Sequence, residues 1–434
     1  MFDILSWFYR YIFIFLLASF LLTSISIYFY EKKQFQPFLS VIIVVTAASS
    51  FALLSLFEEV IDYKAVYIGS IFCFQYIITR ILFIKVLKIK DLLLFDTVNM
   101  LLAIGLVILY RLSPDYAIKQ TMFALLGDIT YFLVFYILRK IDLQKDYSKQ
   151  LGIFILLTLI ITQLWGVQIS GSKNWIEIFS YRFQPSEFLK IIFIIYISTL
   201  FRKGINNNVL WRSSASIVIA AAFFALQRDL GSALIFFIVY LILLFVMDEQ
   251  IYPTIISTTA AVVMAIISFH AFAHIKSRVE AWLNPWKYVS GKAYQVTQSL
   301  FAIASGGLLG TGLNLGSPKF IPAVHTDFIF SAICEETGII SGIIILLLLC
   351  MVTLIGLNFS TNCKDTNNKL ICLGLSSMTG FQTLIIISGV LNIIPITGIT
   401  LPFISYGGSS LLSQIMNIGI LYFINTSEIG ERNE

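Results

Sequence analysis

The 434-residue sequence predicts a polytopic, all-α membrane protein, and three observations support that prediction. Hydrophobic residues make up 58% of the chain and charged residues only 12%, about half the charged share of soluble domains. The mean hydropathy is +0.89. Apolar stretches of about twenty residues recur along the chain, and each one matches the hydrocarbon core of a bilayer. A buried helix of a soluble protein would explain one or two such runs, but not about a dozen.

The apolar runs define about thirteen candidate membrane spans. The first run is expected to stay in the protein, because it lacks a small-residue cleavage site and precedes the charged stretch YEKKQF. The eighth and ninth runs are separated only by LQRDLG, which predicts a tight hairpin or one broken helix. The loop NIIPITGITLPFISYGG before the last run is a candidate re-entrant segment. The expected spans are 8–29, 37–57, 65–86, 92–110, 117–137, 151–168, 186–202, 213–226, 230–248, 252–272, 328–357, 369–390 and 405–425.

Lys and Arg in the short loops predict the orientation, because basic loops face the cytoplasm. The loops 30–35, 138–150 and 201–212 are basic, whereas the loop 58–63 is acidic. The alternation places the long loops 169–185 and 273–327 outside, and an odd count of spans places the N-terminus outside as well. The net charge of +5 lies mostly in these short loops, so it indicates topology and no nucleic-acid partner.

Polar residues near the predicted outer ends of the spans are the candidates for chemistry. Glu187 and Lys190 are three positions apart on one helical face, either as a structural ion pair or as the wall of a polar cavity. Asp229 is expected to cap the helix that follows it. The loop 276–299 concentrates cations on a predicted outer face, which the positive-inside rule does not explain, and favours attraction to an anion such as a lipid phosphate. The stretch IPAVHTDFIF puts an ionisable His and Asp at the start of a span.

Several other kinds of site are not supported. The five cysteines show no CxxC spacing, so a disulfide or a metal site is not expected. The stretch ASGGLLGTGLNLGS matches neither GxxxxGK[ST] nor GxGxxG at the start of a helix, and indicates tight turns rather than a nucleotide site. The glycines of SYGGSS allow close approach of a helix or a ligand.

Five motifs, in order, carry a resemblance to a known family. They are GSKNWIEI…FQPSEFLK, QRDLGSALI, YQVTQSLFAIASGGLLGTGL, PAVHTDFIFSAICEETG and LPFISYGGSS. The sequence resembles the SEDS family of shape, elongation, division and sporulation proteins (FtsW, RodA, SpoVE) over about residues 92–426. The resemblance implies a ten-helix core at 91–426, about three extra N-terminal helices at 1–90, and a cytoplasmic tail at 427–434.

The resemblance also implies an activity. SEDS proteins are peptidoglycan glycosyltransferases that polymerise lipid II, an undecaprenyl-diphosphate-linked disaccharide-pentapeptide, at the outer face of the bacterial cytoplasmic membrane. They work with a class B penicillin-binding protein that forms the peptide crosslinks. The essential acid of the family's HTDF motif falls on Asp327. The substrate-binding candidates are Trp175, Glu187, Lys190, Lys276, Arg278, Gln295, Gln298, His325, Glu335, Glu336, Ser405, Gly407 and Gly408.

In the implied mechanism, Asp327 removes the proton of the acceptor sugar's 4-hydroxyl, and partial burial would raise its pKa toward a useful value. Arg278, Lys276 and Lys190 are candidates for stabilising the departing diphosphate, as is a divalent cation such as Mg²⁺ or Mn²⁺. His325 is either a hydrogen-bond partner of Asp327 or a residue that shapes the turn. The sequence departs from the family after NPW, where Lys287, Tyr288 and Val289 stand in place of the usual acid and proline.

Two other functions are compatible with the same family. A lipid II flippase would depend on charges deep in the bundle and would tolerate loss of Asp327. A non-catalytic scaffold of a cell-wall synthesis complex would depend only on partner-facing helices. The intact HTDF acid favours the polymerase. The sequence does not distinguish a role in division from one in elongation or sporulation.

Overall fold

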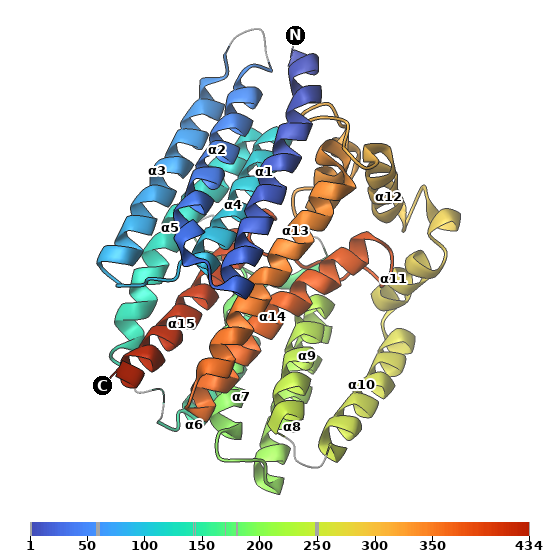
Figure 1. The fold of residues 1–434 in the computed structure, drawn as a ribbon. Helices are drawn as coiled ribbons and strands as arrows, with labels where there is room; N and C mark the ends of the chain where they lie inside the picture. Colours follow the sequence, from blue (N-terminus) through green and yellow to red (C-terminus); the bar gives the residue numbers. More distant parts are fainter. Residues whose placement is uncertain are drawn as a thin grey trace.

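The computed structural model describes residues 2–57, 61–141, 143, 145–169, 171–178, 181–247 and 251–433. Within these ranges α-helices form almost all of the regular structure (Figure 1). The helices are α1 (Phe2–Tyr30), α2 (Gln36–Ser55), α3 (Tyr63–Lys85), α4 (Leu93–Leu112), α5 (Pro114–Leu138), α6 (Ser148–Trp165), α7 (Pro185–Phe201), α8 (Asn207–Gln227), α9 (Leu230–Met247), α10 (Tyr252–Ala271), α11 (Ala273–Leu283), α12 (Tyr294–Gly306), α13 (Ile329–Asn362), α14 (Thr366–Val390) and α15 (Gly408–Asn433). Short 3₁₀ turns are η1 (Lys33–Phe35), η2 (Pro285–Tyr288) and η3 (Pro318–Phe320).

Each expected span coincides with one helix. Within the described ranges, 11 helices are long and apolar enough to cross a membrane, so the chain is a polytopic helical membrane protein. The two remaining expected spans are α7, which has 17 residues, and α15, whose apolar run is interrupted by the buried Gln414 and Asn417. Helix α15 continues to Asn433, so most of the expected tail at 427–434 is helical.

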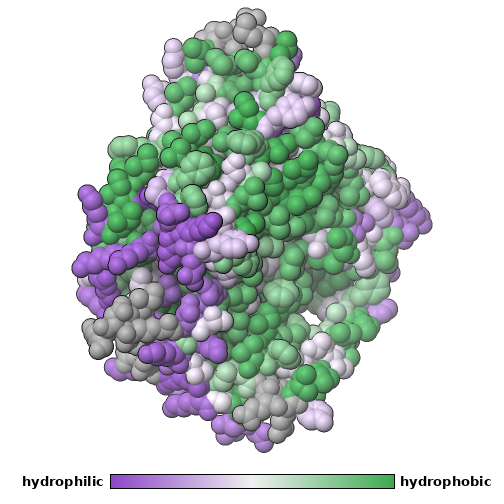
Figure 2. All heavy atoms as spheres, in the orientation of Figure 1, coloured by the Kyte–Doolittle hydropathy of each residue, from purple (hydrophilic) through white to green (hydrophobic). Residues whose placement is uncertain are grey.

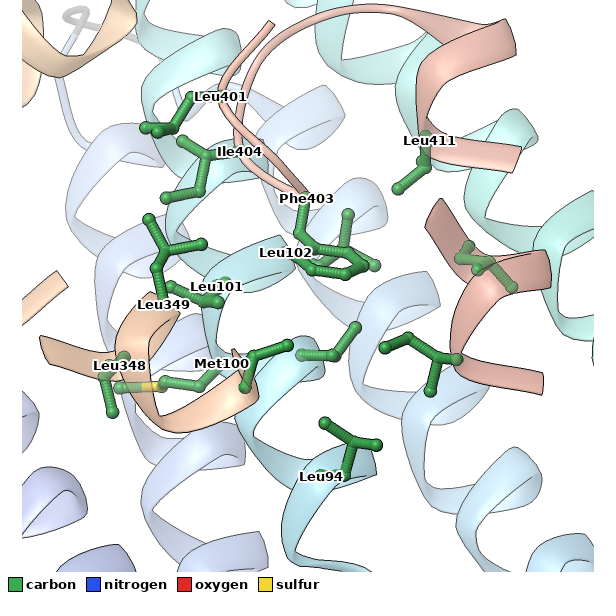
Figure 3. Packing of buried hydrophobic residues seen from close by; sticks show 14 of the residues in the cluster. Leu94, Met100, Leu101, Leu102, Leu348, Leu349, Leu401, Phe403, Ile404 and Leu411 are labelled. Atoms are coloured by element: carbon green, nitrogen blue, oxygen red, sulfur yellow. The ribbon is translucent and has the colours of Figure 1, made fainter. Parts of the chain in front are cut away.

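Helix α4 is the centre of the bundle. Every residue of this helix except Arg111 is buried, because α2, α5 and α13 all pack against it. Figure 3 shows Leu101 and Leu102 of α4 beside Leu349 of α13 and residues of the loop that precedes α15. This continuous apolar packing fixes α4 relative to the helices that carry the polar residues described below.

The loop 391–407 enters the bundle without forming a helix. Its Leu401, Phe403 and Ile404 are buried and point into the core beside α4 (Figure 3). A Cβ atom added at Gly105 of α4 would lie 2.7 Å from the carbonyl oxygen of Ile404, so only glycine allows this close approach. Irregular backbone is tolerated at this depth because protein rather than lipid surrounds it. The expectation of a re-entrant segment therefore agrees with the structure.

The two long loops contain more regular structure than the sequence indicated. Residues 167–183 hold a three-stranded antiparallel sheet in the order β1 (Val167–Ile169), β2 (Ser172–Ile178) and β3 (Tyr181–Phe183), which was not predicted. The loop 273–327 contains α11, α12, η2 and η3. Helices α8 and α9 pack against each other as a hairpin, and Arg228 makes the turn with a φ of 59°.

The first three helices pack on one side of the bundle (Figure 1). Helix α1 contacts α13 and α2, while α2 contacts α3 and α4. Near its end, α1 is held by the Tyr28 hydroxyl, which donates a hydrogen bond to the Leu354 carbonyl at 3.2 Å. On the other side, α10 contacts α9 and α11 and has no buried residue, which suits a helix surrounded by lipid.

Candidate active site

Asp327 lies in the turn that leads into α13. Its backbone N–H donates to the Ala323 carbonyl at 3.2 Å. The residue as a whole is partly exposed, while its carboxylate is buried. Burial raises the pKa of Asp327 to about 6, although the Thr326 side chain and the Arg278 charge oppose that shift. A carboxylate of this pKa is mostly ionised at neutral pH and accepts a proton more readily than an ordinary aspartate.

Arg278 reaches the same place from a different element. It lies on α11, where its Nη1 donates to the carbonyls of Ile396 and Thr397 at 3.1 and 3.2 Å. A Cβ atom added at Gly398 would lie 3.8 Å from Asp327 Oδ2 and 4.0 Å from Arg278 Nη2. The two side chains therefore approach the same bend of the loop 391–407, where each acts on the other through its charge. Burial lowers the pKa of Arg278, whereas the charges of Asp327 and Asp229 act in the opposite direction.

Further basic residues lie on α11 or near it. His274 lies on the same helix, and burial together with the charges of Arg228 and Arg278 lowers its pKa. Arg228 is exposed at the α8–α9 turn. Lys276 is exposed on α11, but a residue two positions from Arg278 does not share its helical face. The structure thus brings together Asp327, Arg278, Arg228 and His274, of which only the first two were predicted as site residues.

His325 packs in an aromatic cluster. Its ring stacks on Tyr116 with 4.3 Å between centroids and 12° between planes, and Tyr406 lies on it at 5.8 Å. Burial lowers the pKa of His325, which favours the neutral imidazole. Its carbonyl accepts a hydrogen bond from the Tyr406 N–H at 2.8 Å. Of the two roles considered for His325, these contacts support shaping of the turn.

The SYGGSS segment holds the Asp327 turn in place. The Ser405 hydroxyl donates to the Thr326 carbonyl at 2.6 Å and accepts from the Leu401 N–H at 2.9 Å. Gln120 of α5 binds the same segment twice, because its amide donates to the Ser405 carbonyl and accepts from the Gly407 N–H. A Cβ at Gly408 would lie 2.3 Å from the Phe123 ring, so this position is fitted to glycine. The predicted residues Ser405, Gly407 and Gly408 thus contact the turn or the helix behind it.

Glu187 and Lys190 form an ion pair with 2.7 Å between Lys190 Nζ and Glu187 Oε1. Both side chains are buried, and Ser413 of α15 donates to the other Glu187 oxygen at 3.3 Å. The pair therefore joins α7 to α15, which matches the structural alternative considered for it. Among the described residues, neither Glu187 nor Lys190 forms a hydrogen bond or an ion pair with Asp327.

Asp229 makes more contacts than the helix cap that the sequence predicted for it. It caps α9 by accepting from the Ser232 N–H at 3.0 Å, as expected. The same carboxylate also accepts from the Asn174 amide at 2.7 Å and the Ser232 hydroxyl at 2.8 Å. Asn174 therefore ties the sheet to α9, and its neighbour Trp175 points to the opposite face of β2. The sequence signal for these additional contacts was an acidic residue, Asp229, in the motif QRDLGSA between two apolar runs.

Glu335 and Glu336 lie on α13 one turn before its kink at Gly338. Glu336 forms an ion pair with Arg111 of α4 at 2.7 Å, and accepts from the Asn314 N–H at 3.1 Å. Glu335 accepts from the Ser317 N–H at 2.8 Å. These contacts fasten the loop 310–317 to α13. Arg111, which was not singled out in the sequence, is their central cation.

Helix α12 carries the last two predicted site residues. Gln295 is exposed and Gln298 is partly exposed, and their three-residue spacing puts them on one helical face. The part of the chain that the structure describes contains no group of three His, Cys, Asp or Glu side chains that would hold a metal ion.

A helical membrane bundle that presents a carboxylate of raised pKa near an arginine defines a class of protein: a membrane enzyme that carries out acid–base chemistry on an anionic substrate. The chain belongs to the FtsW/RodA/SpoVE family of cell cycle proteins, whose family model matches residues 91–429.

Individual relatives agree with this assignment. Peptidoglycan glycosyltransferase RodA of Mycobacterium tuberculosis is 32% identical over 76% of this chain and 77% of its own. Stage V sporulation protein E of Bacillus subtilis is also 32% identical, over 76% and 95%. Probable peptidoglycan glycosyltransferase FtsW of Geobacter sulfurreducens is 30% identical over 78% and 97%.

Two solved structures show the same fold. One belongs to a peptidoglycan synthase complex that coordinates polymerization and crosslinking, with a TM-score of 0.66, 22% identity, and coverage of 78% of this chain and 98% of that one. The other is RodA of Thermus thermophilus, with a TM-score of 0.60, 22% identity, and coverage of 78% and 97%.

Proposed function

We propose that Asp327 is the general base of this chain, which is a peptidoglycan glycosyltransferase that polymerises lipid II. The observation that carries the proposal is that the Asp327 carboxylate and the Arg278 guanidinium both lie next to Gly398 and interact through their charges. One is a proton acceptor with a pKa of about 6, and the other is a donor suited to phosphate oxygens. Relatives named as peptidoglycan glycosyltransferases support the reaction class.

The proposed step is an inverting displacement. Asp327 takes the proton from the 4-hydroxyl of the acceptor N-acetylglucosamine as that oxygen attacks C1 of the donor N-acetylmuramic acid. The bond from C1 to the diphosphate oxygen breaks, and the negative charge leaves with the diphosphate. Arg278 and Arg228 stabilise that charge, because guanidinium groups bind phosphate oxygens through paired N–H donors. Exposed Lys276 attracts the substrate at longer range.

A divalent cation, Mg²⁺ or Mn²⁺, is proposed only as a companion of the substrate diphosphate. Its charge would neutralise the phosphates. The described residues hold no ready-made cluster of metal ligands, so no step is assigned to it here.

We also propose a division of the chain into a core and added helices, an orientation in the membrane and a partner protein. In this proposal, ten membrane-spanning helices (α4–α10 and α13–α15) form a core at residues 91–426, and residues 1–90 add three helices that lie outside the matched range 91–429. The positive-inside rule puts Asp327 at the outer face of the bacterial cytoplasmic membrane. A class B penicillin-binding protein is the proposed partner, since a structure of similar fold comes from a complex that couples polymerization to crosslinking.

A reconstitution experiment separates the polymerase from the flippase. Purified protein, with its penicillin-binding partner, is supplied with lipid II in detergent, where no membrane separates two compartments. We expect glycan strands that a muramidase digests to disaccharide units, because polymerisation needs no transbilayer gradient. Strand formation that is absent in detergent, together with lipid II translocation in proteoliposomes, would support the flippase instead. Absence of both activities would indicate a scaffold.

The pH dependence of polymerisation provides a second test. Asp327 acts in its ionised form and its pKa is raised to about 6, so kcat/KM should fall about tenfold per pH unit below pH 6. Arg278 lowers the pKa of Asp327. The Arg278→Gln variant should therefore be slower and should lose activity at a higher pH than the wild-type protein. A wild-type midpoint near pH 4, or the same midpoint in both proteins, would contradict the assignment of the base.

A further inference from the structure

A basic groove lies at the opposite end of α4 from the Asp327 site. It has a volume of about 640 Å³ and is formed by the α1–α2 connection, the last turns of α3 and the α3–α4 connection. Figure 2 shows hydrophilic residues gathered on the left of the molecule, at the level where these connections lie in Figure 1. Its lining includes Lys33, Gln36, Arg80, Ile84, Lys88 and Lys90.

The charges of this groove are unbalanced. Lys33 pairs loosely with Asp91 at 3.6 Å, with both side chains largely exposed. Arg80 pairs with the fully buried Asp96 at 3.3 Å. Lys88 and Lys90 are exposed and form no ion pair among the described residues. Four cations thus face two carboxylates, which leaves an excess of about two positive charges in one groove.

The groove is rigid on the side that Arg80 occupies. Asp96 Oδ1 accepts from the Tyr76 hydroxyl at 2.8 Å as well as from Arg80 Nε. Asp91 Oδ1 accepts from the Gln36 amide at 3.1 Å and the Leu93 N–H at 3.2 Å. These bonds fix α2, α3 and α4 relative to one another. Arg80 is consequently held in place before any ligand arrives, which lowers the entropic cost of binding at that cation.

The position of the groove favours a lipid over a soluble anion. Helix α4 has 20 residues, so the groove lies about 30 Å from the Arg111 end of that helix, at the other edge of the bilayer. Ile84 in the lining is 47% exposed, and Phe38 and Val86 beside it are 52% and 55% exposed. Cations above exposed apolar side chains match a molecule with an anionic head and hydrocarbon tails.

We propose that this groove binds the phosphate head group of an anionic phospholipid. Arg80, Lys88 and Lys90 contact the phosphate oxygens, while the acyl chains lie against the apolar faces of α2 and α3. A head group of net negative charge is preferred over a zwitterionic one, because two positive charges in the groove lack a protein partner. Most of the groove precedes the family match at 91–429, so the site belongs to the first three helices and does not depend on the proposed glycosyltransferase activity.

Native mass spectrometry of the purified protein tests the proposal. The protein is placed in nanodiscs of phosphatidylcholine with increasing phosphatidylglycerol, and the lipid that stays bound after release is counted. We expect saturable retention of phosphatidylglycerol by the wild-type protein. The double variant Lys88→Gln, Lys90→Gln should bind roughly thirty-fold more weakly, since each cation near an anionic lipid contributes about a factor of five.

A matched control removes the same charge elsewhere. Lys145 is exposed in the α5–α6 connection and Lys149 is exposed in the first turn of α6. The Lys145→Gln, Lys149→Gln variant should retain phosphatidylglycerol as the wild-type protein does. Equal retention by all three proteins, or equal retention of phosphatidylcholine and phosphatidylglycerol, would overturn the proposal. Displacement of the bound lipid by millimolar inorganic phosphate would instead identify a site for free phosphate. Lys88 and Lys90 have no buried partner, so their variants are expected to fold.

Discussion

The Asp327→Asn variant should lose lipid II polymerisation by about 10²- to 10⁴-fold, the usual contribution of a general base. Asparagine has nearly the same shape and keeps the capacity to bond with Thr326, but it does not accept the hydroxyl proton. The measurement is the initial rate of strand formation by the purified variant with its partner. The loss should appear in kcat, because the acceptor and donor sugars still bind.

The folding of this variant is a necessary control. Burial raises the pKa of Asp327, so a neutral amide at this position should leave the thermal unfolding temperature unchanged or raise it. Asp115→Asn supplies a matched substitution, because Asp115 is an exposed acid at the start of α5 and should be dispensable. A polymerisation rate near that of the wild-type protein in Asp327→Asn would rule out its role as the base.

The largest effect on stability is expected at Arg111. Its side chain is 9% exposed and its partner Glu336 is 1% exposed, so Arg111→Ala leaves a buried charge without compensation. Such a loss typically costs about 3–5 kcal/mol. It would also release the Gly316 carbonyl, which accepts from Arg111 at 2.8 Å. Thermal unfolding of the variant in detergent should show a clearly lower midpoint than the wild-type protein.

The control for Arg111 is an exposed pair in the same protein. Arg182 and Glu177 are 3.5 Å apart, but their side chains are 59% and 41% exposed. Arg182→Ala should therefore cost less than about 1 kcal/mol. The double variant Arg111→Met, Glu336→Met should recover much of the loss, since removing both charges leaves neither unpaired. Equal midpoints for Arg111→Ala and Arg182→Ala would show that the Arg111–Glu336 pair does not stabilise the fold.

The sequence predicted the helices well, because length and hydropathy are local properties. The runs at 92–110 and 117–137 became α4 and α5 with boundaries shifted by only a few residues. The small sheet at 167–183 was missed, since its strands are short and have no clear alternation of apolar residues. Asp327 was predicted as the candidate base from its place in the HTDF motif, because the sequence does not show which side chains surround it.

The partners of the site residues were harder to predict. Arg111 and Glu336 are 225 positions apart in the sequence, and no local pattern links them. The stacking of His325 on Tyr116 depends on the first turn of α5 meeting the HTDF turn. Arg278 and Asp327 come near each other at Gly398 of the loop 391–407. These contacts follow from the packing of the whole bundle, which a single sequence does not encode locally.

The buried loop 391–407 also constrains how the protein is made. A helix satisfies its own backbone and can enter the bilayer alone, but an irregular segment in lipid would leave its N–H and C=O groups without partners. Leu401, Phe403 and Ile404 can be buried only after α4 and α13 have come together. Insertion of the helices must therefore precede placement of this segment, and the Gly398 bend forms late in biogenesis. Because that bend lies close to both Arg278 and Asp327, the newly inserted chain should acquire the proposed catalytic arrangement last.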